Sequence, residues 1–216
     1  MAFSPFTAGL FTAGQILTAA QLNTYIRDNI MAGGPVYATE AARNADIPTP
    51  YEGQRAYITG STVAAATGLV TAVPTGIQTI YNGAAWVCVT PVGADTSTGG
   101  TTTSLTYTAT LTSGGTNPSV TLATGTTALV SFGSVLLAPV TGVGVFTAVA
   151  VSGATTQAAS DNLSVSGEIA NYLVCQNSVV FTGLTAGTNT FTLQYRLNTA
   201  GTLSALRRRL IVQGIA

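Results

Sequence analysis

Carboxylates and serine hydroxyls are the side chains in this sequence that could do chemistry, and their spacing is poor for it. Asp161 and Glu168 are the acids of the C-terminal half, and two carboxylates are enough to hydrolyse a glycosidic bond. In the simpler interpretation, the aspartate is a turn residue and the other carboxylate pairs with an arginine. The serines lack a histidine partner, because the chain contains no histidine. We therefore expect no enzymatic activity, no catalytic residues, no cofactor and no metal site.

Three consecutive arginines stand near the C-terminus, where the pattern predicts a strand. Side chains alternate between the two faces of a strand, so Arg208 shares one face with Leu210, while Arg207 and Arg209 share the other with Ile211. A nucleic-acid site needs basic groups that converge on one surface. The formal net charge is also +0, which gives no general attraction to nucleic acid. We expect no nucleic-acid partner.

A second interpretation places Arg208 in a subunit interface. There its guanidinium would pair with Glu168 or Asp161 of the same or a neighbouring chain. The alternative is that all three arginines are solvated charges that keep an edge strand from pairing with other chains.

A sugar-binding surface is a further hypothesis for the C-terminal half. Asn171, Tyr172 and Asn198 lie in expected loops, where a tyrosine ring can stack on a pyranose and amides can bind its hydroxyls. The same residue types also form ordinary turns.

The composition favours a subunit of an assembly. Of the 216 residues, 46% are hydrophobic and only 6% are charged, against about 25% charged residues in an ordinary soluble domain. A neutral surface rich in hydroxyls gives little repulsion between copies. No apolar run approaches the ~18 residues needed to cross a bilayer, so we expect no membrane insertion.

The two cysteines, Cys88 and Cys175, are far apart in the sequence and form no metal-binding pattern. We expect buried free thiols in a protein assembled in a reducing cytoplasm, with a disulfide as the alternative. No secretory signal is apparent at the N-terminus.

The N-terminal segment 1–35 predicts an arm followed by a docking helix. Thr18 and Gln21 form a capping box, and Gly33 follows the helix as a stop signal. A helix of about 13 residues is marginal alone in water, so its apolar stripe should pack on another chain or on copies of itself; the alternative is the protein's own β-domain. The expected docking residues are Phe3, Phe6, Phe11, Leu22, Tyr25, Ile26 and Ile30.

Residues 36–91 predict a small β-minidomain. Thr39 can cap a single helical turn, and strands are expected at 54–58, 76–81 and 85–89. The Asn82-Gly83 pair predicts a tight hairpin, because both residues tolerate positive φ. Trp86 is the only tryptophan, and we expect it to form the minidomain core beside Tyr57 and Tyr81.

Residues 92–104 are Gly-, Ser- and Thr-rich and predict a linker. Beyond it, residues 105–216 predict short strands with spacings of about 8–12 residues, which is typical of a jelly-roll-like antiparallel β-sandwich. The fold class is therefore mainly β, with a short N-terminal helix. The expected strands are 105–112, 119–122, 128–140, 143–152, 163–169, 172–182, 188–197 and 203–212.

Several motifs resemble those of tailed-bacteriophage minor tail and fibre proteins. LTAAQLNTYIRDNI (residues 17–30) resembles their opening helix. AARNADIPTPYEG (41–53), followed by IYNGAAW (80–86), is similar to a small module that they share. The resemblance implies a homotrimer that is attached to other virion proteins by its N-terminus and displays a β-sandwich head, located on the outside of the virion.

Three placements remain open at this stage. The protein could be a minor tail protein, short fibre or spike that touches host-surface glycan. It could instead be a capsid decoration or head-fibre protein on the shell. A tail-tip cell-wall hydrolase module is a further alternative.

Overall fold

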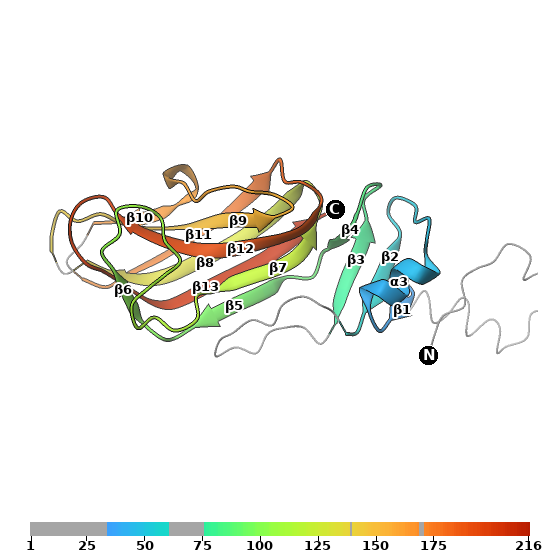
Figure 1. Ribbon diagram of the computed structural model, residues 1–216, viewed down its shortest axis with the longest axis horizontal. Helices are drawn as coiled ribbons and strands as arrows, with labels where there is room; N and C mark the ends of the chain where they lie inside the picture. Colours follow the sequence, from blue (N-terminus) through green and yellow to red (C-terminus); the bar gives the residue numbers. More distant parts are fainter. Residues whose placement is uncertain (1–33, 61–75, 139, 169–170) are drawn as a thin grey trace, which may run out of the picture.

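The computed structural model describes residues 34–60, 76–138, 140–168 and 171–216 (Figure 1). The predicted arm and docking helix, with all seven of their expected docking residues, lie outside the described residues. The described chain folds into a small N-terminal sheet with one short helix, followed by two larger sheets. The mainly β fold class is thereby confirmed.

The N-terminal module consists of a helix and a mixed four-stranded sheet of order β1-β2-β3-β4. Its elements are β1 (Val36–Tyr37), α3 (Glu40–Asp46), β2 (Arg55–Ile58), β3 (Ile77–Tyr81) and β4 (Trp86–Cys88). The predicted cap is confirmed, because the Thr39 hydroxyl accepts a hydrogen bond from the Ala42 amide at 3.1 Å. The three predicted strands of this module are present.

The β3–β4 hairpin forms at the predicted Asn-Gly pair, but by a different mechanism. Of the two residues, only Gly83 has a positive φ, at 88°. Asn82 uses its side chain instead, and its Oδ1 accepts from the amides of Ala84 and Ala85 at 3.2 and 2.9 Å. The loop is therefore an asparagine-stabilised turn between the pair Tyr81 and Trp86.

The prediction that Trp86 forms the core of the module is wrong. Trp86 is half-buried and packs against the edge of the buried interior, which is built from Ala56, Ile58, Ile77 and Cys88. The register places the expected neighbour Tyr57 on the opposite face of the sheet. The expected neighbour Tyr81 does contact Trp86, edge to face at 5.6 Å between ring centroids. The indole is too large for the interior of so small a sheet, and it lies instead under the side chain of an arginine.

The predicted linker 92–104 is not a linker. It contains β5 (Val92–Thr96) and β6 (Gly100–Thr102), both paired antiparallel with β13 (Leu203–Ile215). The glycines and threonines of this segment are typical of linkers, but small residues also occur in edge strands. Sequence composition alone does not distinguish the two, because the partner strand decides. The chain therefore passes directly from the module into the larger sheets.

The C-terminal part is a two-layer sandwich with jelly-roll strand order. One sheet has the order β10-β9-β12-β7 and the other β11-β8-β13-β5, so most strands pair with neighbours that are distant in sequence. The remaining bounds are β7 (Ser119–Thr124), β8 (Thr127–Leu137), β9 (Val145–Gly153), η2 (Asp161–Leu163), β10 (Val165–Gly167), β11 (Leu173–Thr182) and β12 (Gly187–Leu197).

One predicted strand of the sandwich is wrong. The segment 105–112 forms no strand, and it contacts the sheets through isolated bridges from Thr108 to Tyr195 and from Thr112 to Thr101. Its alternation of threonine with larger residues imitates a strand, but the neighbouring edge positions are taken by β5 and β6. The other seven predicted strands are present, with bounds that differ by a few residues.

The core lies between the two sheets. The inward residues of β8, β12 and β13 are buried, as are Cys175 and Phe181 of β11, and the Phe181 and Phe191 rings from opposite sheets meet edge to face at 5.9 Å. Cys88 and Cys175 are both buried and free, as expected.

The module packs against one end of the sandwich (Figure 1). A Cβ on Gly214, at the end of β13, would lie 2.6 Å from the Cys88 carbonyl oxygen, so glycine permits this close approach. The β8–β9, β10–β11 and β12–β13 connections lie at the opposite end, which we call the distal tip.

Candidate functional site: the outer face of one sheet

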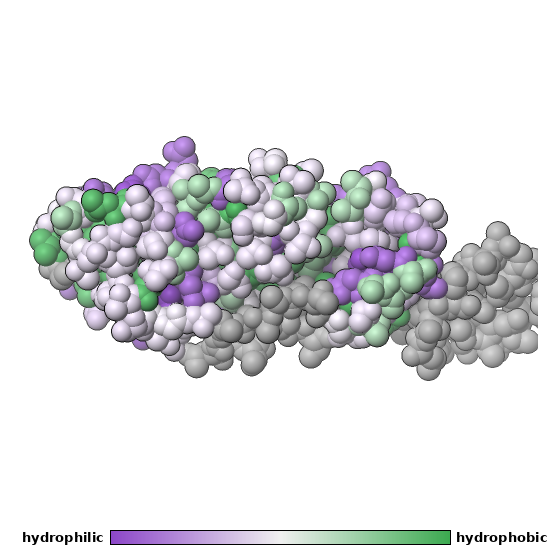
Figure 2. Space-filling view, viewed as in Figure 1, coloured by the Kyte–Doolittle hydropathy of each residue, from purple (hydrophilic) through white to green (hydrophobic). Residues whose placement is uncertain are grey.

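The two sheets of the sandwich present opposite kinds of outer surface. On the β10-β9-β12-β7 sheet, outward positions of β7 and β12 carry hydroxyls that bond one another. Thr121 and Thr190 are 2.8 Å apart, and Ser119 and Thr192 are 3.1 Å apart. Figure 2 shows a surface of mostly near-neutral hydropathy over the sandwich. Such a face is suited to solvent.

The outer surface of the β11-β8-β13-β5 sheet is more hydrophobic, and we call it the apolar face. Val174 is 73% exposed, Val180 is 52% exposed and Ile215 is 42% exposed. Its outward apolar residues from β8, β11 and β13 share one side of the sheet by register: Leu129, Val135, Leu137, Val174, Val180, Leu206, Ile211 and Ile215. Exposed apolar side chains gathered on one sheet face in this way mark interaction surfaces.

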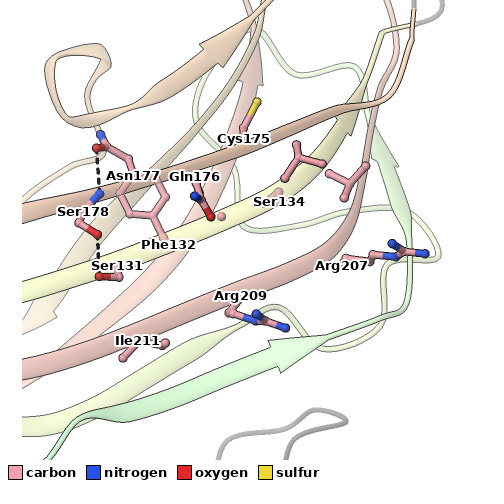
Figure 3. Close-up of a pocket in the computed structure, with 13 residues that line it drawn as sticks. Ser131, Phe132, Ser134, Cys175, Gln176, Asn177, Ser178, Arg207, Arg209 and Ile211 are labelled. Carbon is pink, nitrogen blue, oxygen red and sulfur yellow. Dashed lines mark hydrogen bonds between the residues drawn. The ribbon is translucent and has the colours of Figure 1, made fainter.

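A groove of about 660 Å³ crosses the apolar face (Figure 3). Its floor is Gly133, which lies directly between Gln176 on β11 and Arg209 on β13. A Cβ at Gly133 would lie 2.9 Å from the Cys175 carbonyl oxygen and 3.2 Å from Gln176 Cβ, so glycine permits the close approach of β11 at this row. The next row carries Ser131 and Ser178, whose hydroxyls are 2.8 Å apart. The groove thus has apolar flanks and a donor-rich centre.

A β-bulge sets the position of the arginines in the groove. The register of β13 against β8 shifts between Leu206 and Arg209, and Arg207 has a φ of +46°. The left-handed region costs a residue with a Cβ roughly 1–2 kcal/mol, and a glycine would occupy it without that cost. The backbone therefore does not explain an arginine at 207. Figure 3 shows Arg207 and Arg209 extending to the same side of the strand.

The expected pairing of Arg208 with Glu168 or Asp161 is wrong. Arg208 is fully buried in its own chain. Its Nη atoms donate to Asn117 Oδ1 at 3.0 Å and to the Thr98 carbonyl at 3.1 Å, and also to the Gly114 carbonyl. The bulge turns this side chain inward, where loop carbonyls replace the expected carboxylate. The alternative of three solvated arginines is equally wrong for Arg208.

Asp161 is instead the partner of Arg196. The guanidinium bonds both carboxylate oxygens, and the Tyr107 hydroxyl donates to Asp161 Oδ1 at 2.8 Å. These hydrogen bonds hold the pKa of Asp161 below its usual value, with that of Arg196 first. Arg196 also stacks on Phe146, with Cζ 4.1 Å from the ring centroid. Asp161 is therefore a carboxylate that an arginine holds in its ionised form, which makes it a poor general acid.

The three residues of the sugar hypothesis all belong to the distal tip. Asn171 is exposed and Tyr172 is 64% exposed. The Asn198 side chain, by contrast, accepts a hydrogen bond from the Gly144 amide at 2.7 Å, so it holds the start of β9 in place. Tyr172 and Asn171 therefore remain the groups that are free to meet a ligand there.

A second recess of about 240 Å³ lies between the module and the sandwich. Arg43, 4% exposed, stacks over Trp86 there and donates to Thr79 Oγ1 at 3.1 Å. Burial lowers the pKa of Arg43, and the charge of Glu40 opposes that shift. Burial also raises the pKa of the Cys88 thiol to about 11, so this thiol is a poor nucleophile at neutral pH. We therefore interpret the recess as a packing contact between the module and the sandwich.

No group of three or more potential metal-ligating residues occurs within the described residues. Across the same part of the chain, no helix is long and apolar enough to span a membrane.

Sequence reasoning missed the groove and the apolar face. The available signal was β8 itself, TALVSFGSVLL, which carries leucine or valine at outward as well as inward positions. A nearly continuous apolar strand is typical of strands covered on both faces.

Comparisons with known proteins add little. No family model and no curated protein matches the sequence. Among solved structures, the chain is similar to a tumour necrosis factor, Eiger, from S. frugiperda, with 16% identity and a TM-score of 0.40. That alignment covers 58% of this chain and 93% of the other. The jelly-roll description above therefore depends on the strand order of the chain itself.

Proposed function

We propose that this protein is a non-enzymatic structural subunit of a bacteriophage virion, of the minor tail or short-fibre type. It is a homotrimer that attaches to other virion proteins through residues 1–35 and displays its sandwich outward. It is assembled in the host cytoplasm and resides on the outside of the particle.

The observation that carries the proposal is the contact between Arg43 and Trp86. The two stretches that resemble the phage tail module, 41–53 and 80–86, are separated in sequence by a long insertion. In the fold they form one packed unit at the end of the sandwich where the N-terminal segment enters. A module built around this contact supports the resemblance better than either stretch alone.

The arrangement of the two ends also supports display of the sandwich. Gly34, the first described residue, belongs to the module, and the distal tip lies at the other end of the sandwich (Figure 1). A subunit held by its N-terminal segment would point Tyr172 and Asn171 away from the particle. Host-surface glycan is the ligand class that this tip would meet.

The decisive experiment is mass spectrometry and gel quantification of purified particles that carry this gene. The proposal expects the protein in mature particles at a low copy number that is a multiple of three. Absence from the particles would overturn it. A copy number comparable to that of the major capsid protein would favour the alternative placement as a capsid decoration or head fibre.

Two further assays separate the remaining alternatives. Purified protein should bind host cells or cell-wall glycan if it is a tail or fibre protein. Zymography on host cell wall should show no clearing, and clearing would identify a hydrolase module instead.

A further inference from the structure

The apolar face is the feature of the molecule that the fold leaves unexplained. The β8 strand carries Leu129, Val135 and Leu137 on its outward side, yet within the described residues only its inner side is covered by the second sheet. On the opposite sheet, the outward positions of β7 and β12 carry paired hydroxyls. Since one chain makes both surfaces, the difference between them indicates that water contacts one surface and protein covers the other.

The charges on the apolar face are arranged from centre to edge. Arg207 and Arg209 are exposed on β13, in the interior of the sheet. Asp95 lies opposite Arg209 of the same chain on the edge strand β5, and it interacts within its own chain. Exposed Glu168 follows Gly167, whose backbone lies against Leu173 at the start of the other edge strand, β11. The interior of the face is therefore basic, and the β11 rim carries an exposed carboxylate.

This pattern is complementary to itself. When copies surround a common axis with their apolar faces inward, the rim of one copy meets the interior of the next. The acidic β11 rim then approaches the basic groove, and the valine and isoleucine side chains pack beside it. The groove gives the incoming rim space.

The size of the face is sufficient for such an assembly. The β8 strand has 11 residues, which at ~3.3 Å per residue and ~4.8 Å between strands gives β11, β8 and β13 a surface of roughly 500 Å². Covering one such surface with an equal area of the neighbour's rim buries about 1,000 Å² in total, which is the lower bound for a specific interface.

We propose that copies of this chain associate through the apolar face, with Arg207 of one copy bonded to Glu168 of its neighbour. The proposal rests on the homotrimer of the proposed function and assigns it an interface. It also gives a reason for an arginine at the left-handed position 207, where the side chain serves the neighbouring copy and the backbone alone would favour glycine.

The test measures the molar mass of the full-length protein by light scattering after size exclusion. Wild type should be a trimer, and Val174→Glu and Ile211→Glu should shift the mass to that of the monomer. Gln194→Glu, on the outward side of β12, is the matched control and should stay trimeric. Circular dichroism should be the same for all four proteins, which separates loss of assembly from loss of folding.

A charge reversal tests the pairing itself. Arg207→Glu should weaken assembly at least tenfold in dissociation constant, and Glu168→Arg in the same chain should restore most of that loss. Glu52→Arg, on the exposed turn of the module, should not restore it.

Three results would overturn the proposal. They are a monomeric wild type at micromolar concentration, a trimer that persists in both face variants, and face variants that keep their mass but lose binding to an acidic polysaccharide. The second result would place trimer formation in residues 1–35, and the third would make the groove a ligand site. None of these results removes the protein from the virion, which the particle analysis tests separately.

Discussion

The guanidinium of Arg43 lies over the ring of Trp86, with Cζ 4.4 Å from the ring centroid. The same side chain donates from Nη1 to Thr79 Oγ1 and from Nε and Nη2 to Asn44 Oδ1. Through these contacts a single side chain joins helix α3 to strands β3 and β4. The short module thereby gains a polar centre in place of the aromatic core that its sequence indicates.

Loss of this contact should destabilise the module measurably. Arg43→Ala should lower the free energy of unfolding by about 1–3 kcal/mol, because it removes a buried hydrogen bond to Thr79 and the stacking on Trp86. A double-mutant cycle with Trp86→Leu should give a coupling energy of about 0.5–2 kcal/mol from chemical denaturation. Additive effects of the two substitutions would contradict a direct interaction.

Buried Arg208 should be far more sensitive to substitution than its neighbours. Arg208→Met should cost about 3–5 kcal/mol in unfolding free energy, because the carbonyls of Thr98 and Gly114 lose their donor. Arg208→Lys should recover little, since an ammonium cannot reproduce the planar fork. Arg55→Ala, on an exposed position of β2, is the control and should stay within about 0.5 kcal/mol of wild type. Equal effects at 208 and 55 would contradict the buried network.

Arg207 and Arg209 should respond in opposite ways to glycine. Arg207→Gly should raise the unfolding free energy of the isolated subunit by about 0.5–1 kcal/mol, because φ is positive there. Arg209→Gly should lower it by a similar amount, because extended backbone gains nothing from glycine. Both measurements need the Ile211→Glu background, in which the subunit is expected to be monomeric. Destabilisation by Arg207→Gly would argue that this side chain is required for folding.

The Asp161–Arg196 pair predicts a defined pH dependence. Because the pKa of Asp161 is lowered in the folded state, its contribution is fully present above the unfolded pKa near 4 and is lost as pH falls through the folded value. The difference in melting temperature between wild type and Asp161→Asn should therefore be constant at neutral pH and shrink in acid. The carboxylate is 54% exposed, so the difference should be small. A difference that grows in acid would contradict the pairing.

Tyr107 gives the matching test at alkaline pH. Burial, followed by the hydrogen bond to Asp161, raises the pKa of Tyr107 to about 12. Its neutral form therefore stabilises the fold below the unfolded pKa near 10, and this contribution is lost as pH rises toward 12. Tyr107→Phe should remove one late-titrating phenol from the ultraviolet titration and flatten the alkaline loss of stability. An unchanged titration curve would show that Tyr107 is solvated.

Local pattern was sufficient for much of the architecture. The alternation in β12, the Thr39 cap, the Asn82-Gly83 turn and the buried thiols all follow from interactions between near neighbours or from the period of a single strand. These features depend on backbone geometry within a few residues, and one chain segment contains the information for them.

The tertiary structure decided the rest, because it depends on which strands become neighbours. Residues 92–104 are strands only because β13 offers them an edge, and 105–112 is a loop because those edges are filled. Arg208 is buried because a bulge in β13 turns it toward loops about a hundred residues earlier in the chain. The apolar face exists because the jelly-roll order places β8 between β11 and β13, so that outward side chains from three distant segments share one surface.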